Sequence, residues 1–145
     1  MTVPKISVRN LQRKISVNVA ELERFSKYAV QHSLQLPKRR RTDLRKLSEI
    51  FIELISDRRM ALLHRKFLGQ SGPTDVLTFQ HGEIFISVDT ARRHAHAFEN
   101  SLLRELKLYI AHGLLHLHGF DDKTPSESHK MKAAQEKILR NCCAL

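Results

Sequence analysis

The sequence predicts a single α+β domain in which a small, mixed four-stranded sheet packs against about five helices. Short apolar segments alternate with longer segments whose apolar residues recur every three or four positions, as in amphipathic helices. Two of the short segments are joined by only three residues, which predicts a hairpin. The 145 residues contain no repeat or long linker, and 41% are hydrophobic, enough for one core.

The first half of the chain predicts two strands and two helices. Residues 6–8 are expected to form a short strand, and Asn18 followed by Glu21 resembles a capping box that begins a helix. Residues 47–55 alternate in part between apolar and acidic side chains, which predicts the second strand. Asp57 is then expected to cap the second helix. The residues expected on the buried faces of these two helices are Leu22, Phe25, Ala29, Met60, Leu63 and Phe67.

The second half predicts a hairpin followed by three helices. Residues 76–79 and 83–88 have the short apolar patterns of strands. Their apolar side chains are expected to form core rather than a surface for stacking nucleic-acid bases. Helices are predicted over residues 89–98, 102–118 and 125–139, because apolar residues recur there at helical spacing.

The charge of the chain favours a polyanionic partner. Lys and Arg number 25 against 15 acidic residues, which gives a formal net charge of +10 and a pI near 10.1. A surplus of this size is typical of nucleic-acid-binding proteins, although it also serves solubility. The densest basic run is either a nucleic-acid-binding segment or a solvated loop. It consists of Lys38, Arg39, Arg40 and Arg41.

The sequence gives no sign of a membrane partner. It has no run of about 18 apolar residues that would span a bilayer. The first residues lack the hydrophobic stretch of a signal peptide, so we expect a cytoplasmic protein. Cys142 and Cys143 are adjacent, a spacing that suits neither a mutual disulfide nor a zinc site. They are expected to be reduced thiols.

The segment from His112 to Asp122 predicts a metal site. His112 and His116 are four residues apart, an offset of about 40° on a helix, so both imidazoles project from one face. Gly119 permits a left-handed turn that brings the chain back, and Asp122 then stands where a third ligand is needed. Asp121 is the alternative ligand or a hydrogen-bond acceptor for a ligating histidine. His118 is expected on the surface or behind the ligands. His129 is a weaker candidate ligand.

Three protein ligands predict a catalytic rather than a structural zinc. They leave a fourth position for water, whose pKa a bound zinc lowers to about 7. The peptidase pattern H-E-x-x-H has a glutamate general base directly after the first histidine. Gly113 occupies that position and cannot accept a proton. The sequence therefore favours hydrolysis of a phosphodiester over hydrolysis of a peptide.

Three segments together resemble the YbeY family of metal-dependent endoribonucleases. They are Gly-Pro-Thr-Asp-Val-Leu-Thr-Phe at 72–79, Gly-Glu-Ile-Phe-Ile at 82–86 and His-Gly-Leu-Leu-His-Leu-His-Gly-Phe-Asp at 112–121. The resemblance implies a zincin-like α+β fold, one zinc ion bound through His112 and His116, and cleavage of single-stranded RNA by metal-activated water. It also implies a role in maturation and quality control of ribosomal RNA, with the ribosome or small-subunit factors as partners.

The chain departs from the family pattern at two places. The family usually has histidine where this chain has Asp122. With a carboxylate ligand in place of a neutral histidine, the zinc site has one net positive charge instead of two. The zinc is therefore expected to be a weaker Lewis acid. The family also tends to carry Tyr-Arg where this chain has Phe67 and Leu68. Arg65 and Lys66 lie close by in the sequence and are candidate phosphate contacts in place of the missing arginine.

Two other functions remain open from the sequence. The missing arginine favours a ribosome-associated RNA-binding factor in which zinc mainly stabilises the fold. A metallopeptidase is the third interpretation, against which Gly113 argues.

Overall fold

The structure is a computed structural model and describes residues 3–37 and 44–143. The strands are β1 (Lys5–Asn10), β2 (Glu49–Ile55), β3 (Val76–Phe79) and β4 (Glu83–Ser87). The helices are α1 (Val19–Leu34), α2 (Asp57–Leu68), α3 (Val88–Ala97), α4 (Leu102–Leu117) and α5 (Pro125–Cys143), with a short 3₁₀ helix at Leu44–Lys46. The basic run Lys38, Arg39, Arg40 and Arg41 lies outside the described residues.

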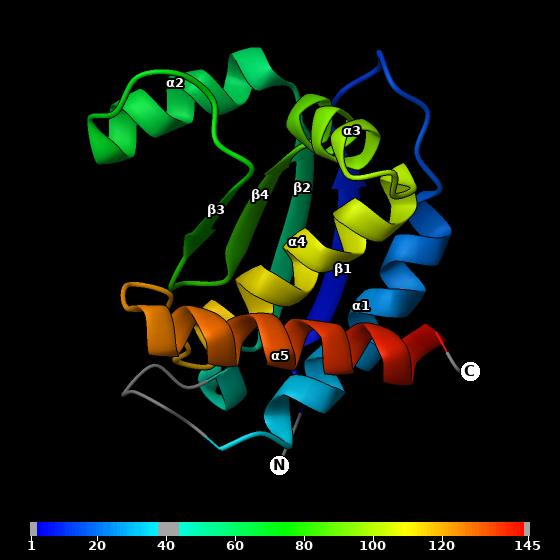
Figure 1. The fold of residues 1–145 in the computed structure, drawn as a ribbon, viewed down its shortest axis with the longest axis vertical. Coiled ribbons are helices and arrows are strands. Elements are labelled where there is room, and N and C mark those ends of the chain that lie inside the picture. The colour runs from blue at the N-terminus through cyan, green and yellow to red at the C-terminus, as the bar shows by residue number, and fades with distance from the viewer. Residues whose placement is uncertain (1–2, 38–43, 144–145) are drawn as a thin grey trace.

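The predicted mixed, four-stranded sheet is confirmed (Figure 1). Its strand order is β1-β2-β4-β3, with β1, β2 and β4 parallel and β3 antiparallel to β4. The antiparallel pair is the predicted hairpin. In the described part of the chain β3 pairs only with β4, so the other edge of β3 faces away from the sheet.

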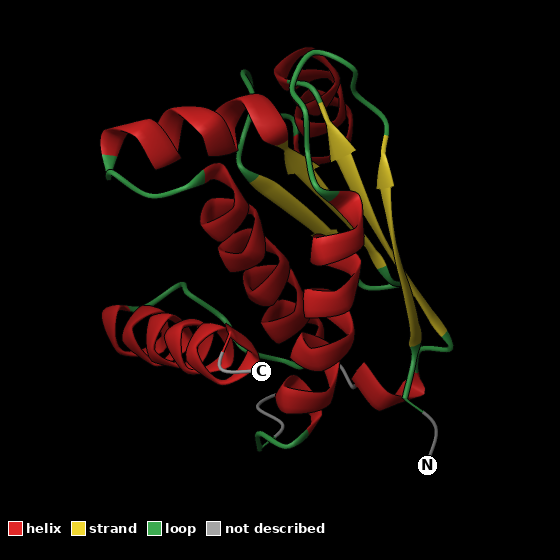
Figure 2. Cartoon of the chain, turned by 90° about the vertical axis from the view of Figure 1, so that its right-hand side faces the viewer, coloured by secondary structure: helices red, strands yellow, loops and turns green. Residues whose placement is uncertain are grey.

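The helices are distributed unevenly over the sheet (Figure 2). Helices α1 and α4 pack on one face, and α5 lies outside them. The main core lies in this layer and includes Leu22, Ile52, Ile84, Ile110 and Leu114. A smaller apolar cluster joins α2 to the hairpin through Ile55, Met60, Leu77 and Phe85. This arrangement places the end of α4 next to β3, at the edge of the sheet.

The helix ends show where local sequence patterns were informative. The Asn18 side chain accepts from the Glu21 backbone N–H at 3.1 Å and caps α1, as predicted. The prediction that Asp57 caps α2 is wrong, because Ser56 accepts from the Arg59 backbone N–H at 3.2 Å and takes that role. A serine directly before the first helical residue suits the N-cap position as well as aspartate does.

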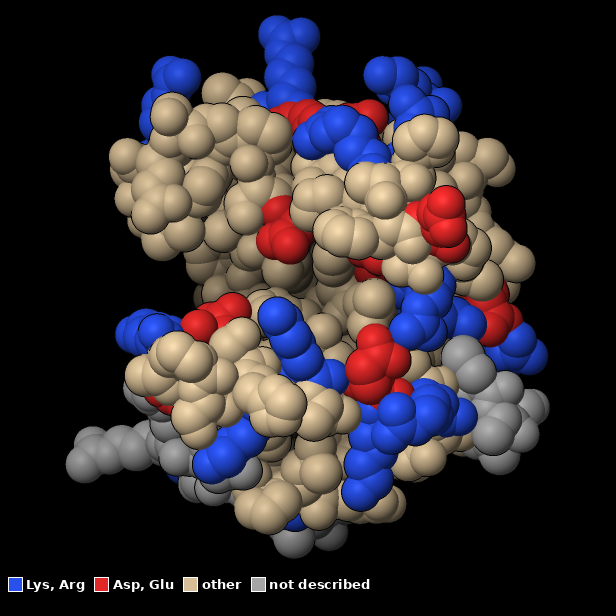
Figure 3. Space-filling view, viewed as in Figure 1, with Lys and Arg blue, Asp and Glu red and all other residues tan. Residues whose placement is uncertain are grey.

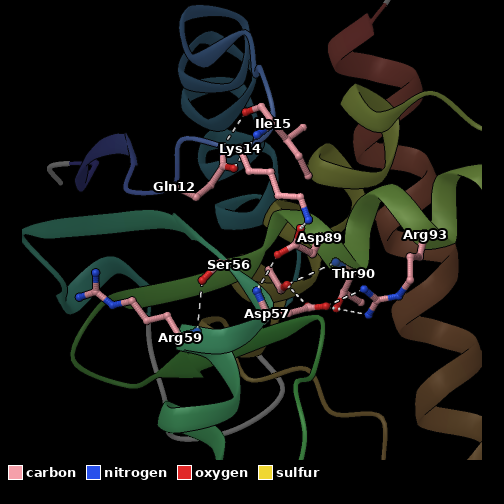
Figure 4. A network of polar contacts seen from close by, with 10 residues as sticks. Gln12, Lys14, Ile15, Ser56, Asp57, Arg59, Asp89, Thr90 and Arg93 are labelled. Carbon is pink, nitrogen blue, oxygen red and sulfur yellow. Dashed lines mark hydrogen bonds and ion pairs between the residues drawn. The ribbon is translucent and has the colours of Figure 1, made fainter.

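The Asp57 carboxylate instead connects two helices (Figure 4). It accepts hydrogen bonds from Ser87 at 2.5 Å and Thr90 at 2.7 Å, and it forms an ion pair with Arg93 at 2.5 Å. In the other direction, the Asp57 backbone N–H donates to Asp89 at 2.8 Å. Burial pulls the pKa of Asp57 upward, but the bonds from Ser87, Thr90 and Arg93 outweigh it and lower the pKa. The contact fixes the start of α2 to the start of α3.

Other predictions need correction. Phe67 was expected on the buried face of α2, yet it is 52% exposed, because the last turn of α2 extends past the small apolar cluster. The second strand begins at Glu49 rather than at residue 47, after the unpredicted 3₁₀ helix. Helix α5 continues to Cys143 instead of ending near residue 139, so Cys142 lies within a helix. Within the described ranges, no helix is both long and apolar enough to cross a bilayer.

Candidate metal centre

Helix α4 carries the two histidines on a face left open by the core. Ser101 caps the helix by accepting from the Arg104 backbone N–H at 3.1 Å, and most apolar residues of α4 are buried against the sheet and the neighbouring helices. His112 and His116 are only partly buried and lie one turn apart. Their rings are 4.5 Å apart between centroids and nearly perpendicular. The helix therefore presents both imidazoles to one point outside the core.

The turn after α4 brings in the third residue of the group. Gly119 adopts a φ of 94°, a conformation that favours glycine, and reverses the chain. The Phe120 backbone N–H returns to the Leu115 carbonyl at 2.9 Å and closes the turn. The Asp122 carboxylate then lies 3.7 Å from His112 Nε2 and 4.0 Å from His116 Nε2. Among the described residues, His112, His116 and Asp122 form a group that could hold a metal ion.

The distances within this group approach those of a tetrahedral site. The two Nε2 atoms are 3.0 Å apart. Two nitrogens bound tetrahedrally to one zinc stand about 3.3 Å apart, given Zn–N bonds of about 2.05 Å. If the Asp122 carboxylate moved slightly toward the histidines, the three groups would occupy three corners of a tetrahedron.

Hydrogen bonds fix which nitrogen of each histidine is free. His112 Nδ1–H donates to Gln135 Oε1 at 2.8 Å, and His116 Nδ1–H donates to the Phe120 carbonyl at 3.1 Å. With the protons held at Nδ1, both Nε2 atoms present lone pairs to each other and to a carboxylate. Three electron-rich groups so close together favour a cation between them. Acceptors of this kind behind ligating histidines are typical of metal sites.

The electrostatics of His116 favour the neutral imidazole. Burial lowers its pKa, the nearby His112 lowers it further, and the carboxylate of Asp122 raises it only in part. A neutral imidazole is the form that binds metal.

Gly113 has a packing role that the sequence did not reveal. A Cβ at this position would lie 2.9 Å from two carbon atoms of the Ile84 side chain, which is fully buried in β4. Helix α4 therefore approaches the sheet very closely next to the first histidine. A glutamate at position 113, as in the peptidase pattern, would collide with the sheet.

Two pockets open on either side of His112. One of about 240 Å³ is bounded by β3 and the end of α2, and its lining includes His116, Thr78, Gln80 and Leu68. The other, of about 180 Å³, lies toward α5 and is lined in part by Asp122, Lys132 and Gln135. Figure 3 shows this face hollowed between the regions of α2 and α5, with Lys and Arg gathered where α5 lies. The candidate metal centre is therefore reachable from solvent.

A comparison with protein families assigns the chain. The family model described as Endoribonuclease YbeY matches residues 7–142, almost the whole chain. The chain belongs to the YbeY family. The resemblance that rested on three segments is thereby confirmed.

Individual YbeY relatives align with about two thirds of the chain. A protein of Phocaeicola vulgatus named Endoribonuclease YbeY is 38% identical over 102 residues, which cover 66% of this chain and 74% of that protein. One of Thermus thermophilus with the same name is also 38% identical over 102 residues, 62% and 73% of the two chains. A third, from Anaeromyxobacter, is 37% identical over 103 residues, and this chain spans about half (54%) of its length.

A solved structure shares the fold. The solution structure of TM1509 from Thermotoga maritima superposes with a TM-score of 0.59 at 24% identity, covering 96% of this chain and 92% of that one. The predicted zincin-like fold, with a four-stranded mixed sheet and five helices, is confirmed for this YbeY chain.

The structure separates the remaining predicted residues of the YbeY chain. Arg65 and Lys66 stand in the last turn of α2, but it is Leu68 that lines the pocket containing both histidines. His129 is exposed and lies outside the His112, His116 and Asp122 group. Asp121 accepts from the Asp122 backbone N–H at 2.7 Å.

Two features of the site were not predicted correctly. His118 was expected on the surface or behind the ligands, but it is fully buried and its Nε2 bonds the Leu36 carbonyl at 2.7 Å. Its backbone N–H still donates to the Leu114 carbonyl at 3.0 Å, so His118 keeps its helical position opposite the two ligand histidines, and this side of α4 is buried, as Ala111 and Leu114 are. Gln135, the acceptor for His112, was missed because it comes from α5, 23 residues away, and only tertiary packing brings it there.

Proposed function

We propose that this chain is a zinc-dependent endoribonuclease that cleaves single-stranded RNA within ribosomal RNA precursors. In this proposal it binds one zinc ion through His112, His116 and Asp122 and acts in the cytoplasm, in ribosome maturation and quality control. The basic composition, with a net charge of +10, supports an RNA substrate. The name Endoribonuclease YbeY, carried by the relatives, supports the reaction.

One observation carries the proposal most strongly. Two histidine Nε2 lone pairs lie 3.0 Å apart beside a carboxylate, and the proton of each ring is occupied elsewhere. While both imidazoles are neutral and carry their proton at Nδ1, no hydrogen bond between the two rings can relieve that arrangement. The three groups fit zinc, which prefers nitrogen and carboxylate oxygen ligands in tetrahedral geometry. Three protein ligands and an open pocket leave room for a substrate oxygen or water.

The residues around that ion would have different roles. When bound, zinc supplies a Lewis acid and a water whose pKa is near 7. Gln135 and the Phe120 carbonyl hold the two imidazoles in the ligating tautomer and orientation. Asp122 reduces the positive charge of the site, because it is an anion in a position where a histidine would be neutral.

Basic side chains at the edges of the two pockets would contact the RNA phosphates. Lys132 is exposed on α5 and lines the same pocket as His112 and Asp122. Its ammonium group can therefore reach a backbone phosphate placed over the ligand group. Arg65 and Lys66, in the last turn of α2, stand near the other rim as further phosphate contacts. The basic run from Lys38 to Arg41 remains a proposed RNA contact.

The test compares two histidine variants. Purified wild type should contain one zinc per chain and cleave single-stranded RNA, whereas His112→Ala should lose both zinc and cleavage. His129→Ala is the matched control, since His129 is exposed and lies outside the ligand group. Metal analysis and a gel-based cleavage assay give the two readouts, and melting curves verify folding. Undiminished RNA cleavage by zinc-free His112→Ala would contradict the proposal.

A ribosome-bound factor with a structural zinc is the second candidate. Its support is Leu68, an apolar residue in the pocket beside the histidines, where the family tends to have arginine. For such a factor, removing zinc should lower the melting temperature. A folded His112→Ala chain should still bind ribosomes and keep its cellular role, which separates this candidate from the nuclease.

A further inference from the structure

An exposed group of rings stands beside the candidate metal centre. Phe67 and Phe79 meet edge to face, with centroids 5.2 Å apart, and Phe79 stacks on His81 at 5.8 Å with 23° between the rings. Phe67 is 52% exposed and His81 is also exposed, whereas Phe79 is partly covered. We call Phe67, Phe79 and His81 the ring strip. Single exposed apolar residues are ordinary on protein surfaces, but adjoining exposed rings form an apolar patch of the kind that marks binding sites.

The ring strip is held in place by its surroundings. Phe79 also packs edge to face on Phe85, which is buried in the small cluster under α2. His81 Nε2 contacts Glu83 Oε1 at 2.6 Å, which fixes the orientation of the imidazole. Phe79 and His81, the two rings of the hairpin, are therefore held in position before any ligand arrives. Binding on these two rings costs little side-chain entropy.

The strip is continuous with the pocket that contains the two histidines. Thr78 and Gln80, the neighbours of Phe79 in the chain, line that pocket together with His112 and His116. Leu68, next to Phe67, lines it as well. Side chains alternate along a strand, so Thr78 and Gln80 face the opposite side of β3 from Phe79. The pocket also reaches Leu77, on the side of Phe79, at the free edge of the sheet. A chain molecule that crosses this edge touches both the pocket and the strip.

The charge beside the strip indicates the class of ligand. Lys66 Nζ lies 5.4 Å from the centroid of the Phe67 ring, and Arg65 precedes it in the same turn of α2. Rings interleaved with cations are the surface that single-stranded nucleic acids use, because bases stack on the rings and phosphates meet the cations. In a duplex the base faces are already stacked on one another and unavailable.

We propose that the ring strip is a stacking platform for unpaired RNA bases next to the phosphate at the metal centre. The inference rests on the proposed function, in that RNA is the substrate. It gives a physical origin for single-strand specificity, since only unpaired bases offer a free face. In this proposal, stacking supplies part of the binding that an arginine at the position of Leu68 would supply by charge.

The test measures RNA affinity and cleavage separately. Affinity is followed by fluorescence anisotropy with a 2′-O-methyl single strand, which resists cleavage, and KM and kcat are measured with an unmodified strand. Phe67→Ala should weaken single-strand binding about 5- to 10-fold, near the lower limit for loss of one stacking ring. KM should rise by a similar factor while kcat changes little. Phe67→Trp should retain wild-type affinity, and His81→Ala should repeat the loss.

Two controls make the effect specific to stacking. Leu62→Ala removes an apolar side chain of the same helix that is 61% exposed and outside the strip, and it should leave affinity unchanged. A strand with abasic sites has phosphates but no bases there, and it should bind wild type and Phe67→Ala equally. Equal binding of the ordinary single strand by wild type and Phe67→Ala, with wild type still cleaving RNA, would overturn the stacking platform alone. A wild-type chain that neither binds nor cleaves RNA overturns the proposed function as well.

Discussion

Gln135 gives the sharpest test of how the site is built. Its side-chain oxygen accepts the Nδ1–H of His112 at 2.8 Å and fixes the tautomer that exposes Nε2. The equivalent acceptor of His116 is a backbone carbonyl, which substitution cannot remove. Gln135→Met keeps the length of the side chain and deletes the acceptor, so the variant perturbs the metal centre without changing any ligand.

Zinc affinity should fall in Gln135→Met for two physical reasons, and each sets the size of the loss. Loss of a hydrogen-bond partner behind a metal ligand typically costs 10- to 100-fold in metal affinity. That range corresponds to about 1.4–2.7 kcal/mol. Independently, the His112 side chain is only 22% exposed, so its Nδ1–H would be left largely without a partner, at a cost of about 1–3 kcal/mol. We therefore expect a zinc dissociation constant about 10- to 100-fold larger in Gln135→Met.

The assay is a competition titration of zinc against a chelator of known affinity. Glu136→Met is the matched control, because it makes a similar change at the neighbouring position of α5 and removes the Arg104 ion pair at 2.9 Å. It should affect how α5 packs but not the zinc affinity. Equal zinc affinity in wild type and Gln135→Met would refute the argument that tautomer control matters at this site.

Four other substitutions test the charge of the metal site, the packing of α4, the phosphate contacts and the Asp57 contact. Asp122→His should restore a doubly charged zinc site and raise the cleavage rate, measured under single-turnover conditions with saturating zinc; a slower variant would count against the charge argument. Gly113→Ala should destabilise the fold by about 1–3 kcal/mol, because its Cβ would lie 2.9 Å from Ile84, and urea unfolding measures this. Lys132→Ala should raise KM and make the salt dependence of RNA binding shallower; unchanged values of both would remove Lys132 from the phosphate contacts. The pKa of Asp57 is lowered from 3.8 in the folded state, so its carboxylate stabilises the fold above pH 3.8 and loses this effect as the pH falls through the folded-state pKa. The unfolding free energy of Asp57→Asn should therefore vary less with pH in this range than that of the wild type.

Local patterns predicted much of the fold and of the metal group. The order of strands and helices follows from periodicity, and the cap at Asn18 from a short motif. His112 and His116 converge because a four-residue offset on a helix dictates it, and Gly119 turns the chain as expected with a φ of 94°. These features depend on residues within one or two turns of each other, where the backbone alone sets the geometry.

Features that depend on distant residues were not predictable in this way. Asp57 has the composition of a cap, but packing of α2 beside α3 makes it an acceptor for Ser87 and Thr90. Phe67 follows the helical period of buried residues, yet the cluster under α2 ends before it. Gln135 carries no motif at all, because its role arises only when α5 crosses α4.

Exposure of Phe67 changes the view of the region around β3. The hairpin side chains were expected to be core, and this holds for Leu77 and Phe85, which are buried. Phe79 is only partly covered and connects Phe67 to His81. A packing surface and a ligand surface thus share one strand, which the alternation of side chains permits.

X-ray absorption of the zinc-loaded protein would show which atoms bind the metal. We expect two imidazoles, with all nitrogen and oxygen ligands at about 2.0–2.2 Å. His116→Ala should lose one imidazole from the spectrum if it retains any zinc. A sulfur ligand at about 2.3 Å would place the metal at the cysteines near the end of α5 and contradict the assignment of His112, His116 and Asp122.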